Sequence, residues 1–351
     1  MRIAQVAPLF ESVPPKLYGG TERIVSYLTE ELVRQGHEVT LFASGDSLTG
    51  ARLIPGSRGS LRLDDKCRDQ LAHHIVMLEK VAQHSHEFDV VHFHIDYIHF
   101  PLARRWSTGY LTTLHGRLDY ADLVPLYREF RDSPLVSISD AQRAPLPWAC
   151  WQATIYHGLP LGLYHLQEDP GDYLAFLGRT SPEKGLDQAV EIARRSGMPL
   201  KVAGKVDRVD REYFEEVLRP MMDDPLVEFI GEIDEQDKQE FLGNAYAVLF
   251  PINWPEPFGL VMIEAMACGS PVIAYRNGSV PEVMRDSETG FIVDGPADAV
   301  RALERLPEVS RRGCRRMFER EFTVERMAHD YLRVYDGLVR SGREELALTE
   351  V

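Results

Sequence analysis

Two glutamates, Glu256 and Glu264, are separated by eight positions at the start of an apolar segment. Because Pro257 disfavours helical geometry at the residue before it, Glu256 is expected in a loop. From Phe258 onward the sequence predicts an apolar helix that stops at Gly269. The N-terminus of a helix carries a partial positive charge and free backbone N–H groups, and both suit a phosphate.

A carboxylate beside a phosphate would repel it, so Glu256 and Glu264 are better suited to accept hydrogen bonds from hydroxyl groups. Two hydroxyl-bearing groups on either side of a phosphate describe a sugar nucleotide. From the spacing alone, the equal alternative is an ordinary loop glutamate and a solvated helix glutamate. The free N–H groups of the predicted helix would belong to its first residues, which are Phe258, Gly259, Leu260 and Val261.

The segment from Pro255 to Gly269, with its Pro-Phe-Gly-Leu start and Ala-Met-Ala-Cys-Gly exit, resembles the Glu-x7-Glu signature of retaining GT-B glycosyltransferases of the family-4 type. The resemblance implies an α/β fold with two Rossmann-like domains facing a central cleft. It implies that Glu256 contacts the hydroxyls of the donor sugar and that Glu264 contacts the nucleotide ribose. It also assigns the backbone N–H groups between them to the distal phosphate and the sugar.

A second segment resembles the same family. Gly178 and Arg179 end a buried strand, and Lys184 follows in the turn, as in the Gly-Arg-x4-Lys-Gly motif that clamps the donor diphosphate. Such cations are needed because negative charge develops on a departing nucleoside diphosphate. Standing alone, one arginine and one lysine in a loop would be ordinary surface residues. Lys205 is a further candidate for the phosphate clamp.

The first half of the chain adds Gly19, Gly20 and His115. The glycine pair precedes an amphipathic helix and resembles the loop that approaches the donor diphosphate in the family, although a flexible turn is the plainer interpretation. The loop lacks Gly-x-Gly-x-x-Gly, which disfavours a nicotinamide dinucleotide. His115 ends a predicted strand, where ligands gather in parallel sheets, and it resembles a family histidine close to the transferred sugar. A structural histidine is the alternative.

His92, His94 and Asp96 alternate along one predicted strand and would share a face, as a metal site could require. Strand-end histidines that make hydrogen bonds are the commoner case, and the family resembled needs no metal for its chemistry. We therefore expect neither a metal nor a cofactor.

The composition narrows the class of partner. The chain has 351 residues, 54 acidic against 39 basic side chains and a formal charge of −15, which argues against nucleic acid and against general attraction to anionic lipid. No apolar run approaches the length of a membrane span, and contact with a membrane surface stays open. Four scattered cysteines fit a reducing cytoplasm.

The length suits two domains of about 150 residues each. We expect an N-terminal acceptor-side domain over residues 1–160 and a C-terminal nucleotide-sugar-binding domain over 161–322. A helix with an acidic tail, residues 323–351, is expected to pack back on the first domain. Residues 61–85 are expected to be mostly helical, and residues 110–116 are expected to form a strand.

The predicted reaction transfers a hexose from a nucleotide-diphosphate sugar to a hydroxyl of a small molecule or glycan, with retention of configuration. A UDP-sugar is favoured, with a GDP-sugar as the alternative. The resemblance implies transfer on one face of the sugar, and no candidate nucleophile of the glycosidase type is found. Two alternatives remain: a nucleotide-sugar epimerase or hydrolase of the same shape, and a non-catalytic nucleotide-sugar-binding protein.

Overall fold

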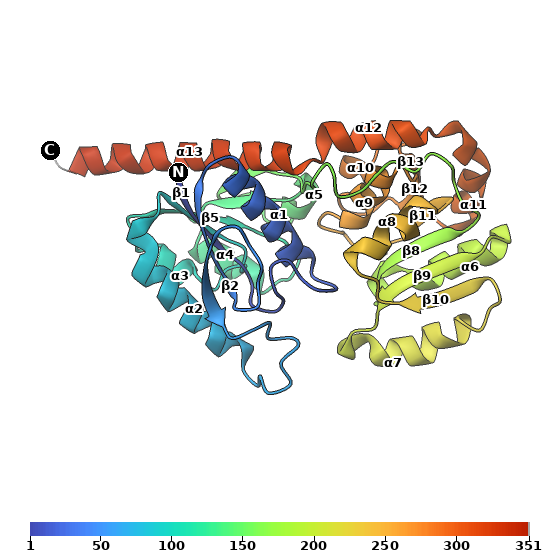
Figure 1. Ribbon diagram of the computed structural model, residues 1–351, viewed down its shortest axis with the longest axis horizontal. Coiled ribbons are helices and arrows are strands. Elements are labelled where there is room, and N and C mark those ends of the chain that lie inside the picture. Colours follow the sequence, from blue (N-terminus) through green and yellow to red (C-terminus); the bar gives the residue numbers. More distant parts are fainter. Residues whose placement is uncertain (350–351) are drawn as a thin grey trace. The chain divides into compact units, whose positions relative to one another are not determined.

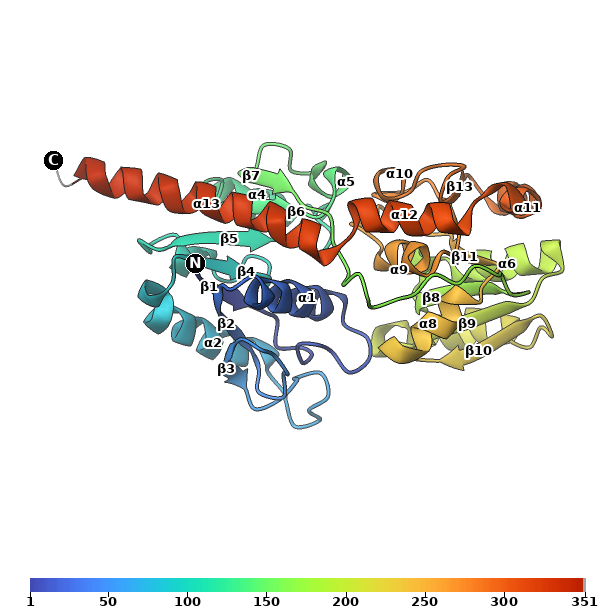
Figure 2. The same ribbon diagram turned by 45° about the horizontal axis from the view of Figure 1, so that its top comes forward.

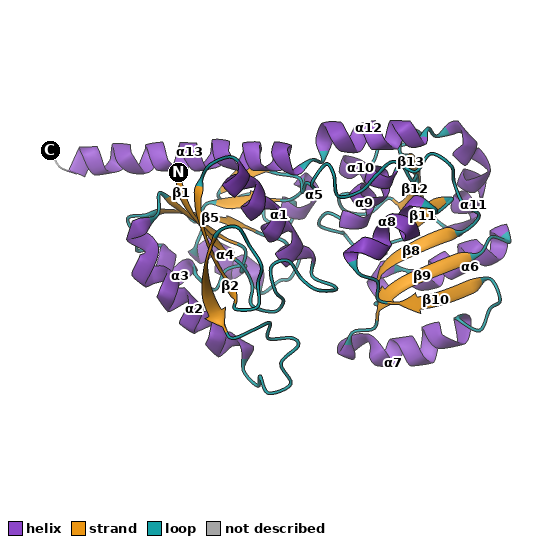
Figure 3. Cartoon of the chain, in the orientation of Figure 1, coloured by secondary structure: helices purple, strands orange, loops and turns teal. Residues whose placement is uncertain are grey.

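The computed structural model describes the backbone of residues 1–349 and the side chains of residues 1–341. The chain divides into two compact units. The first consists of Met1–Gly158 with Val324–Val351, and the second of Leu159–Thr323. Each unit contains one parallel β-sheet with helices packed on it (Figure 1, Figure 3). The predicted α/β class with two Rossmann-like sheets is confirmed.

The first unit contains a seven-stranded sheet in the order β3-β2-β1-β4-β5-β6-β7. Strand β1 lies near its centre, with Ile3, Ala4 and Val6 fully buried. The strand order changes direction between β1 and β4, and ligands of such sheets bind beyond the carboxyl ends of strands at this kind of switch point. The strands are β1 (Arg2–Val6), β2 (Glu38–Ser44), β3 (Arg52–Ser57), β4 (Val90–Phe93), β5 (Gly109–Thr113), β6 (Leu135–Ser137) and β7 (Trp151–Thr154).

Helices cover this sheet by burying apolar side chains at helical spacing. In α1, the buried stripe consists of Ile24, Val25, Leu28 and Leu32, as expected for an amphipathic helix. The helices before the second unit are α1 (Gly20–Arg34), α2 (Gln70–His84), α3 (Phe100–Ala103), α4 (Leu123–Glu129) and α5 (Asp140–Arg143).

Helix α13 (Val324–Thr349) belongs to the first unit and contacts α1, β4 and β5 (Figure 1, Figure 2). Tyr331 and Tyr335 are buried there, at 1% and 0% exposure. The predicted acidic tail is helical to Thr349, and residues 350 and 351 lie outside the described residues. Within the described part of the chain, no helix is both long enough and apolar enough to cross a membrane.

The second unit contains a six-stranded parallel sheet in the order β10-β9-β8-β11-β12-β13, with its switch between β8 and β11. The strands are β8 (Leu174–Arg179), β9 (Leu200–Lys205), β10 (Val227–Gly231), β11 (Ala247–Phe250), β12 (Val272–Tyr275) and β13 (Gly290–Val293). The helices are α6 (Leu186–Ser196), α7 (Arg211–Tyr213), α8 (Glu235–Gly243), α9 (Leu260–Cys268), α10 (Val280–Val283), α11 (Pro296–Arg305) and α12 (Arg311–Glu321).

The helix predicted over residues 61–85 is wrong in its first part. Helix α2 begins only at Gln70, where the Asp69 side chain caps it by accepting a hydrogen bond from the Ala72 backbone N–H. The preceding segment is held elsewhere, because Leu61 donates its backbone hydrogen bond to the carbonyl of Leu9. A long-range contact therefore overrides a locally helical pattern.

Strand β3 was not predicted. It contains Pro55 and Gly56, two residues that are unfavourable inside strands. β3 is an edge strand paired only with β2, and an edge tolerates a proline that cannot donate a hydrogen bond. Its place in the sheet, which the sequence does not reveal, explains the composition.

Candidate functional site

In the second unit, the turn after β8 packs directly against the loop after β11. Gly185 has a left-handed backbone (φ 70°), and a Cβ added there would collide with the carbonyl oxygen of Pro251. Asn253 donates its backbone hydrogen bond to the carbonyl of Glu183 at 2.8 Å. The requirement for glycine at 185 therefore follows from the close approach of these two chain segments.

This approach brings Lys184 and Glu256 into contact. The Nζ atom of Lys184 lies 2.5 Å from Oε2 of Glu256, and their side chains are only 14% and 10% exposed. The same carboxylate oxygen accepts a hydrogen bond from the indole Nε1–H of Trp254 at 2.9 Å. The Lys184 ammonium also lies 5.2 Å from the centroid of the Trp254 ring, within the range of a cation–π interaction.

A second glycine turn holds the backbone around Glu256. Gly278 is left-handed (φ 54°), and a Cβ there would overlap the backbone N and O atoms of Glu256. Ser279 donates from its backbone N–H to the Glu256 carbonyl at 3.0 Å and from its hydroxyl to the Phe258 carbonyl at 2.8 Å. The loop that carries Glu256 is thus fixed by backbone contacts on both sides.

The helix after Glu256 starts later than predicted. Helix α9 begins at Leu260, because Gly259 adopts a left-handed conformation (φ 81°) that no helical residue has. A Cβ on Gly259 would come within 2.8 Å of Phe250 and Met262 side chains. The N–H groups at the helix start therefore include those of Leu260 and Val261, whereas Phe258 and Gly259 precede the helix.

Glu264 lies in the second turn of α9 and is nearly buried, with a side chain 4% exposed. Its Oε1 pairs with Nζ of Lys238 at 2.7 Å, and Lys238 also lies 3.4 Å from Glu235. The Tyr164 hydroxyl donates to Glu235 in turn. A carboxylate buried in an apolar helix needs such a partner, and Lys238 on α8 supplies it.

Arg179, at the end of β8, is surrounded by carboxylates. Its guanidinium lies 3.0 Å from Glu183 and 3.7 Å from Asp207. Asp207 also pairs with Lys205 at 2.6 Å. Gly178 precedes Arg179 in β8, opposite Gly204 of β9. The two cations Arg179 and Lys205 are thus brought together through one shared carboxylate.

In the first unit, His115 lies two residues beyond the end of β5. Gln142 fixes the backbone on both sides of it, because its side-chain amide donates to the carbonyls of Leu114 and Gly116, each at 2.8 Å. The Gln142 side-chain oxygen accepts from the Ile138 backbone N–H at 2.9 Å. A single glutamine therefore joins the end of β6 to the carbonyls of the two residues that flank His115.

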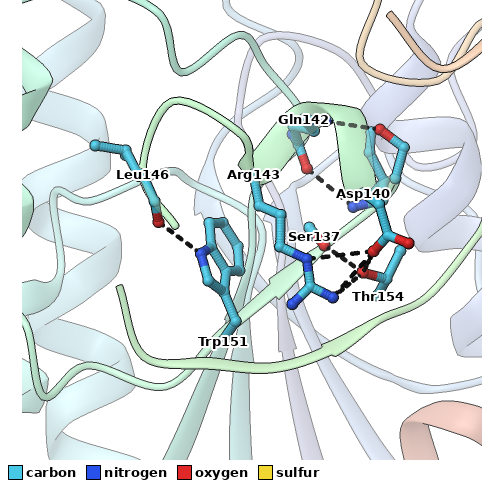
Figure 4. Close-up of polar contacts among 9 residues, drawn as sticks. Ser137, Asp140, Gln142, Arg143, Leu146, Trp151 and Thr154 are labelled. Carbon is cyan, nitrogen blue, oxygen red and sulfur yellow. Dashed lines mark hydrogen bonds and ion pairs between the residues drawn. The ribbon is translucent and has the colours of Figure 1, made fainter. Parts of the chain in front are cut away.

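Gln142 is itself held by the short helix α5, as Figure 4 shows. Ser139 caps this helix by accepting a hydrogen bond from the Gln142 backbone N–H at 3.0 Å. The neighbouring Asp140, Arg143 and Thr154 form a polar cluster, with 2.5 Å between the Thr154 hydroxyl and Asp140. The helix is thereby tied to β7 at the carboxyl end of the sheet.

The ring of His115 contacts two other histidines. Its Nε2 lies 2.9 Å from Nδ1 of His94, and its ring stacks on His157 with centroids 5.3 Å apart and planes inclined by 16°. Burial lowers the pKa of His115 to about 3, because a buried imidazole is costly to charge. His115 is therefore neutral at physiological pH.

His92 and His94 do lie close together, with ring centroids 4.0 Å apart. Their nitrogens are occupied by other contacts: His92 bonds to Tyr335 at 2.6 Å and to Thr113 at 2.7 Å. No group of three or more metal-ligating side chains is found among the described residues. The hydrogen-bonded explanation of these histidines is thus the one the geometry favours.

Gly19 and Gly20 mark the start of α1, which begins at Gly20 with Gly19 as its N-cap. A Cβ on Gly19 would come within 2.7 Å of Pro15 and 3.3 Å of Glu11, so this position requires glycine for the packing of its own loop. The following Glu22 is buried, and burial raises its pKa to about 7.

The predicted residues thus fall into two groups, one in each unit. Arg179, Lys184, Lys205, Glu256 and the α9 start cluster around the switch point of the second sheet, and His115 with the glycine pair belongs to the first unit. Sequence reasoning missed Trp254, Lys238 and Gln142. Trp254 stands two residues before Glu256 and could have been noticed, whereas Lys238 is far from Glu264 in sequence and carries no local signal.

Two family descriptions match successive parts of the chain. Residues 18–155 match "Glycosyltransferase Family 4", and residues 165–317 match "Glycosyl transferases group 1". The chain belongs to the group 1 GT-B glycosyltransferases. This glycosyltransferase transfers a sugar from a nucleotide-sugar donor.

Three distant relatives of this group 1 glycosyltransferase each match nearly all of the chain. The O-antigen chain mannosyltransferase C of Escherichia coli is 23% identical, covering 96% of this chain and 99% of the relative. AviGT4, a glycosyltransferase of avilamycin A biosynthesis, has a TM-score of 0.72 at 26% identity and covers 97% and 98% of the two chains. Anabaena HepE, solved with UDP and glucose, has a TM-score of 0.73 at 18% identity, over 96% and 100%.

Proposed function

We propose that this glycosyltransferase moves a hexose from a nucleoside diphosphate to an acceptor hydroxyl with retention of anomeric configuration. The second unit binds the donor, and the first unit contributes His115 and the Gly19–Gly20 loop. The observation that carries the proposal is the contact between Lys184 and Glu256. The bond that breaks in the donor joins the sugar to a phosphate, and this pair offers a cation and a carboxylate 2.5 Å apart.

Each side chain of the donor site has a task set by its charge. Arg179 and Lys184, assisted by Lys205, neutralise the diphosphate, whose negative charge grows as it departs. Glu256 accepts hydrogen bonds from sugar hydroxyls, and Glu264 accepts them from the ribose. The N–H groups of Leu260 and Val261 face the distal phosphate, since the start of α9 favours negative charge.

The carboxylate neighbours of these cations favour reversible binding. Arg179 and Lys205 already share Asp207, and Lys184 already pairs with Glu256. When a diphosphate binds, the cations exchange their contacts with carboxylates for contacts with phosphates. When the product leaves, they return to the carboxylates and keep an anionic partner. Because these carboxylates hold the cations in place, the site requires little reorganisation during the reaction.

Retention follows in this proposal from transfer on one face of the sugar. The acceptor hydroxyl attacks the anomeric carbon as the bond to the diphosphate breaks, and the departing phosphate oxygen takes the acceptor proton. No metal and no cofactor take part. Incubation with a chelator tests this directly: transfer should persist, and strict dependence on added divalent metal would contradict it.

The donor is proposed to be a UDP-sugar. HepE was solved with UDP and glucose, which supports this choice, and a GDP-sugar is the alternative. A thermal-shift series with UDP-, GDP- and ADP-sugars separates these, because a ligand that binds the native state raises the unfolding temperature. A GDP-sugar as the strongest stabiliser would overturn the choice of base.

The donor identified in this way then distinguishes a transferase from an epimerase, a hydrolase or a binding protein. With donor alone, a transferase should consume little substrate, whereas a nucleotide-sugar epimerase or hydrolase would convert it without an acceptor. With small-molecule and glycan acceptors, NMR of the product reports the anomeric configuration, and inversion would contradict the proposed mechanism. Failure of all acceptors despite tight donor binding would favour a binding protein.

The acidic balance and unpaired cysteines are in keeping with a cytoplasmic site of action.

A further inference from the structure

The ring of His115 is linked to the middle of the first sheet through two other side chains. His94 contacts His115 with its Nδ1, and its Nε2 lies 2.8 Å from the side-chain oxygen of Gln5. The amide nitrogen of Gln5 lies 3.1 Å from the hydroxyl of Tyr335 on α13. With the Gln5 amide in this orientation, its oxygen faces His94.

The positions of the hydrogens follow along this chain. An amide oxygen only accepts, so Nε2 of His94 carries the hydrogen that it donates to Gln5. Burial holds the pKa of His94 well below its ordinary value, so the neutral ring has a single hydrogen and its Nδ1 accepts. Nε2 of His115 must then be the donor, and Nδ1 of neutral His115 carries a lone pair without a hydrogen.

We propose that Gln5 and His94 are positioning residues that hold His115 in its Nε2–H tautomer and so direct a bare Nδ1 lone pair at a hydroxyl of the transferred sugar. The Nδ1 atom of His115 is buried and has no hydrogen-bond partner within the described part of the chain. A lone pair recognises a hydroxyl hydrogen, whereas an N–H at the same place would recognise a carbonyl or ether oxygen.

Two further contacts leave the ring little freedom to change its role. Gln142 holds the carbonyls of the residues before and after His115, and His157 stacks on the ring face. The backbone, the ring plane and the tautomer are therefore each fixed by a different neighbour. The hydroxyl target rests on the proposed function, but the tautomer rests on the hydrogen-bond chain alone.

The tautomer can be observed without any substrate. NMR of the full chain labelled with ¹⁵N in the histidine rings distinguishes a protonated from an unprotonated ring nitrogen, and the signals lost in His115→Gln identify His115. We expect a hydrogen on Nε2 and none on Nδ1. A hydrogen on Nδ1 would overturn the proposal, since a reversed Gln5 amide reverses every donor in the chain.

Gln5→Met removes the acceptor for His94 and should turn the His115 spectrum into a mixture of both tautomers. Tyr331→Phe is the matched control, because it alters the same buried network at the Thr113 hydroxyl but leaves Gln5 and His94 in place. The control should show an unchanged His115 spectrum. Unchanged His115 signals in a folded Gln5→Met protein would refute the positioning role.

Kinetics then test the hydroxyl target. Gln5→Met should lower kcat/KM by about 10-fold, the lower end of the effect seen when a metal-binding histidine loses its outer hydrogen-bond partner. Gln5→Glu should restore most of it by returning an acceptor oxygen. If the tautomer is as proposed but His115→Ala transfers sugar normally, the hydroxyl target and the proposed role of His115 are refuted together, while the tautomer assignment stands. If no donor is turned over at all, the proposed function fails instead.

Discussion

Lys184 and Glu256, 72 positions apart in the chain, form an ion pair of 2.5 Å at the switch point of the second sheet. Lys184 follows β8 and Glu256 follows β11, and these two strands are neighbours in the sheet. Because both side chains are mostly buried, each is the other's main compensation for lost hydration. The pair therefore affects both stability and the chemistry proposed for it.

Lys184→Ala should reduce sugar transfer by at least about 100-fold, because it removes a fixed cation from the departing diphosphate. The protein should remain folded by circular dichroism. Lys66→Ala, which removes an exposed lysine of the first unit, should leave transfer unchanged. Near-normal turnover by Lys184→Ala would contradict the clamp assignment.

The double variant Lys184→Ala/Glu256→Gln should separate stability from activity. Lys184→Ala alone leaves a largely buried carboxylate without its cation, and this lowers the free energy of unfolding. Neutralising Glu256 in the same protein should recover much of the lost thermal stability but none of the transfer rate. Recovery of transfer in the double variant would show that Lys184 acts only to balance Glu256.

Lys238→Met should weaken donor binding through Glu264. Without its partner at 2.7 Å, the Glu264 carboxylate is no longer held in place for its proposed contact with the ribose. We expect a higher KM for the donor with a smaller change in kcat, and weaker binding of the free nucleoside diphosphate with little change for inorganic diphosphate. Lys238→Arg should retain most of the affinity. An equal loss for both ligands would place the effect on the phosphates instead.

Gln142→Leu should loosen the His115 segment. It breaks the contacts with Leu114, Gly116 and Ile138, each of which contributes about 1 kcal/mol, so we expect a lower unfolding temperature together with slower transfer. Gln152→Leu, a change at an exposed position, should alter neither. Full activity in a destabilised Gln142→Leu protein would show that His115 does not depend on this clamp.

Glu22 should make stability fall as pH rises towards neutrality. Burial raises its pKa from 4.5 to about 7, with the nearby Glu11 adding to the rise and Arg62 opposing it. Below pH 4.5 the folded and unfolded forms are both protonated. Above that pH the unfolded chain ionises first, so the native state loses up to about 3 kcal/mol by the time pH passes 7.

Glu22→Gln removes this dependence. Thermal unfolding at about pH 5 and about pH 8 should show a larger gain over wild type at the higher pH. The exposed Glu38 provides the control, and Glu38→Gln should follow wild type at both values. An equal effect of Glu22→Gln at the two pH values would mean that Glu22 does not titrate in this range.

The sequence by itself determines the alternation of strands and helices, because buried parallel strands and amphipathic helices have distinct apolar patterns. It also determines the donor-site candidates, since Arg179, Lys184, Glu256 and Glu264 stand in short motifs whose spacing is local. Helix boundaries were less predictable. The sequence permits Gly259 inside a helix, whereas the structure shows that its backbone is left-handed and that the helix begins after it.

Only the tertiary structure decides which side chains meet. The contact of Lys184 with Glu256 depends on β8 and β11 being neighbours, and strand order is a long-range property. Lys238 reaches Glu264, and Tyr335 reaches Gln5, across 26 and 330 positions. Such pairings carry no periodic signal in the chain, because they arise from packing between elements and not from the conformation of either element alone.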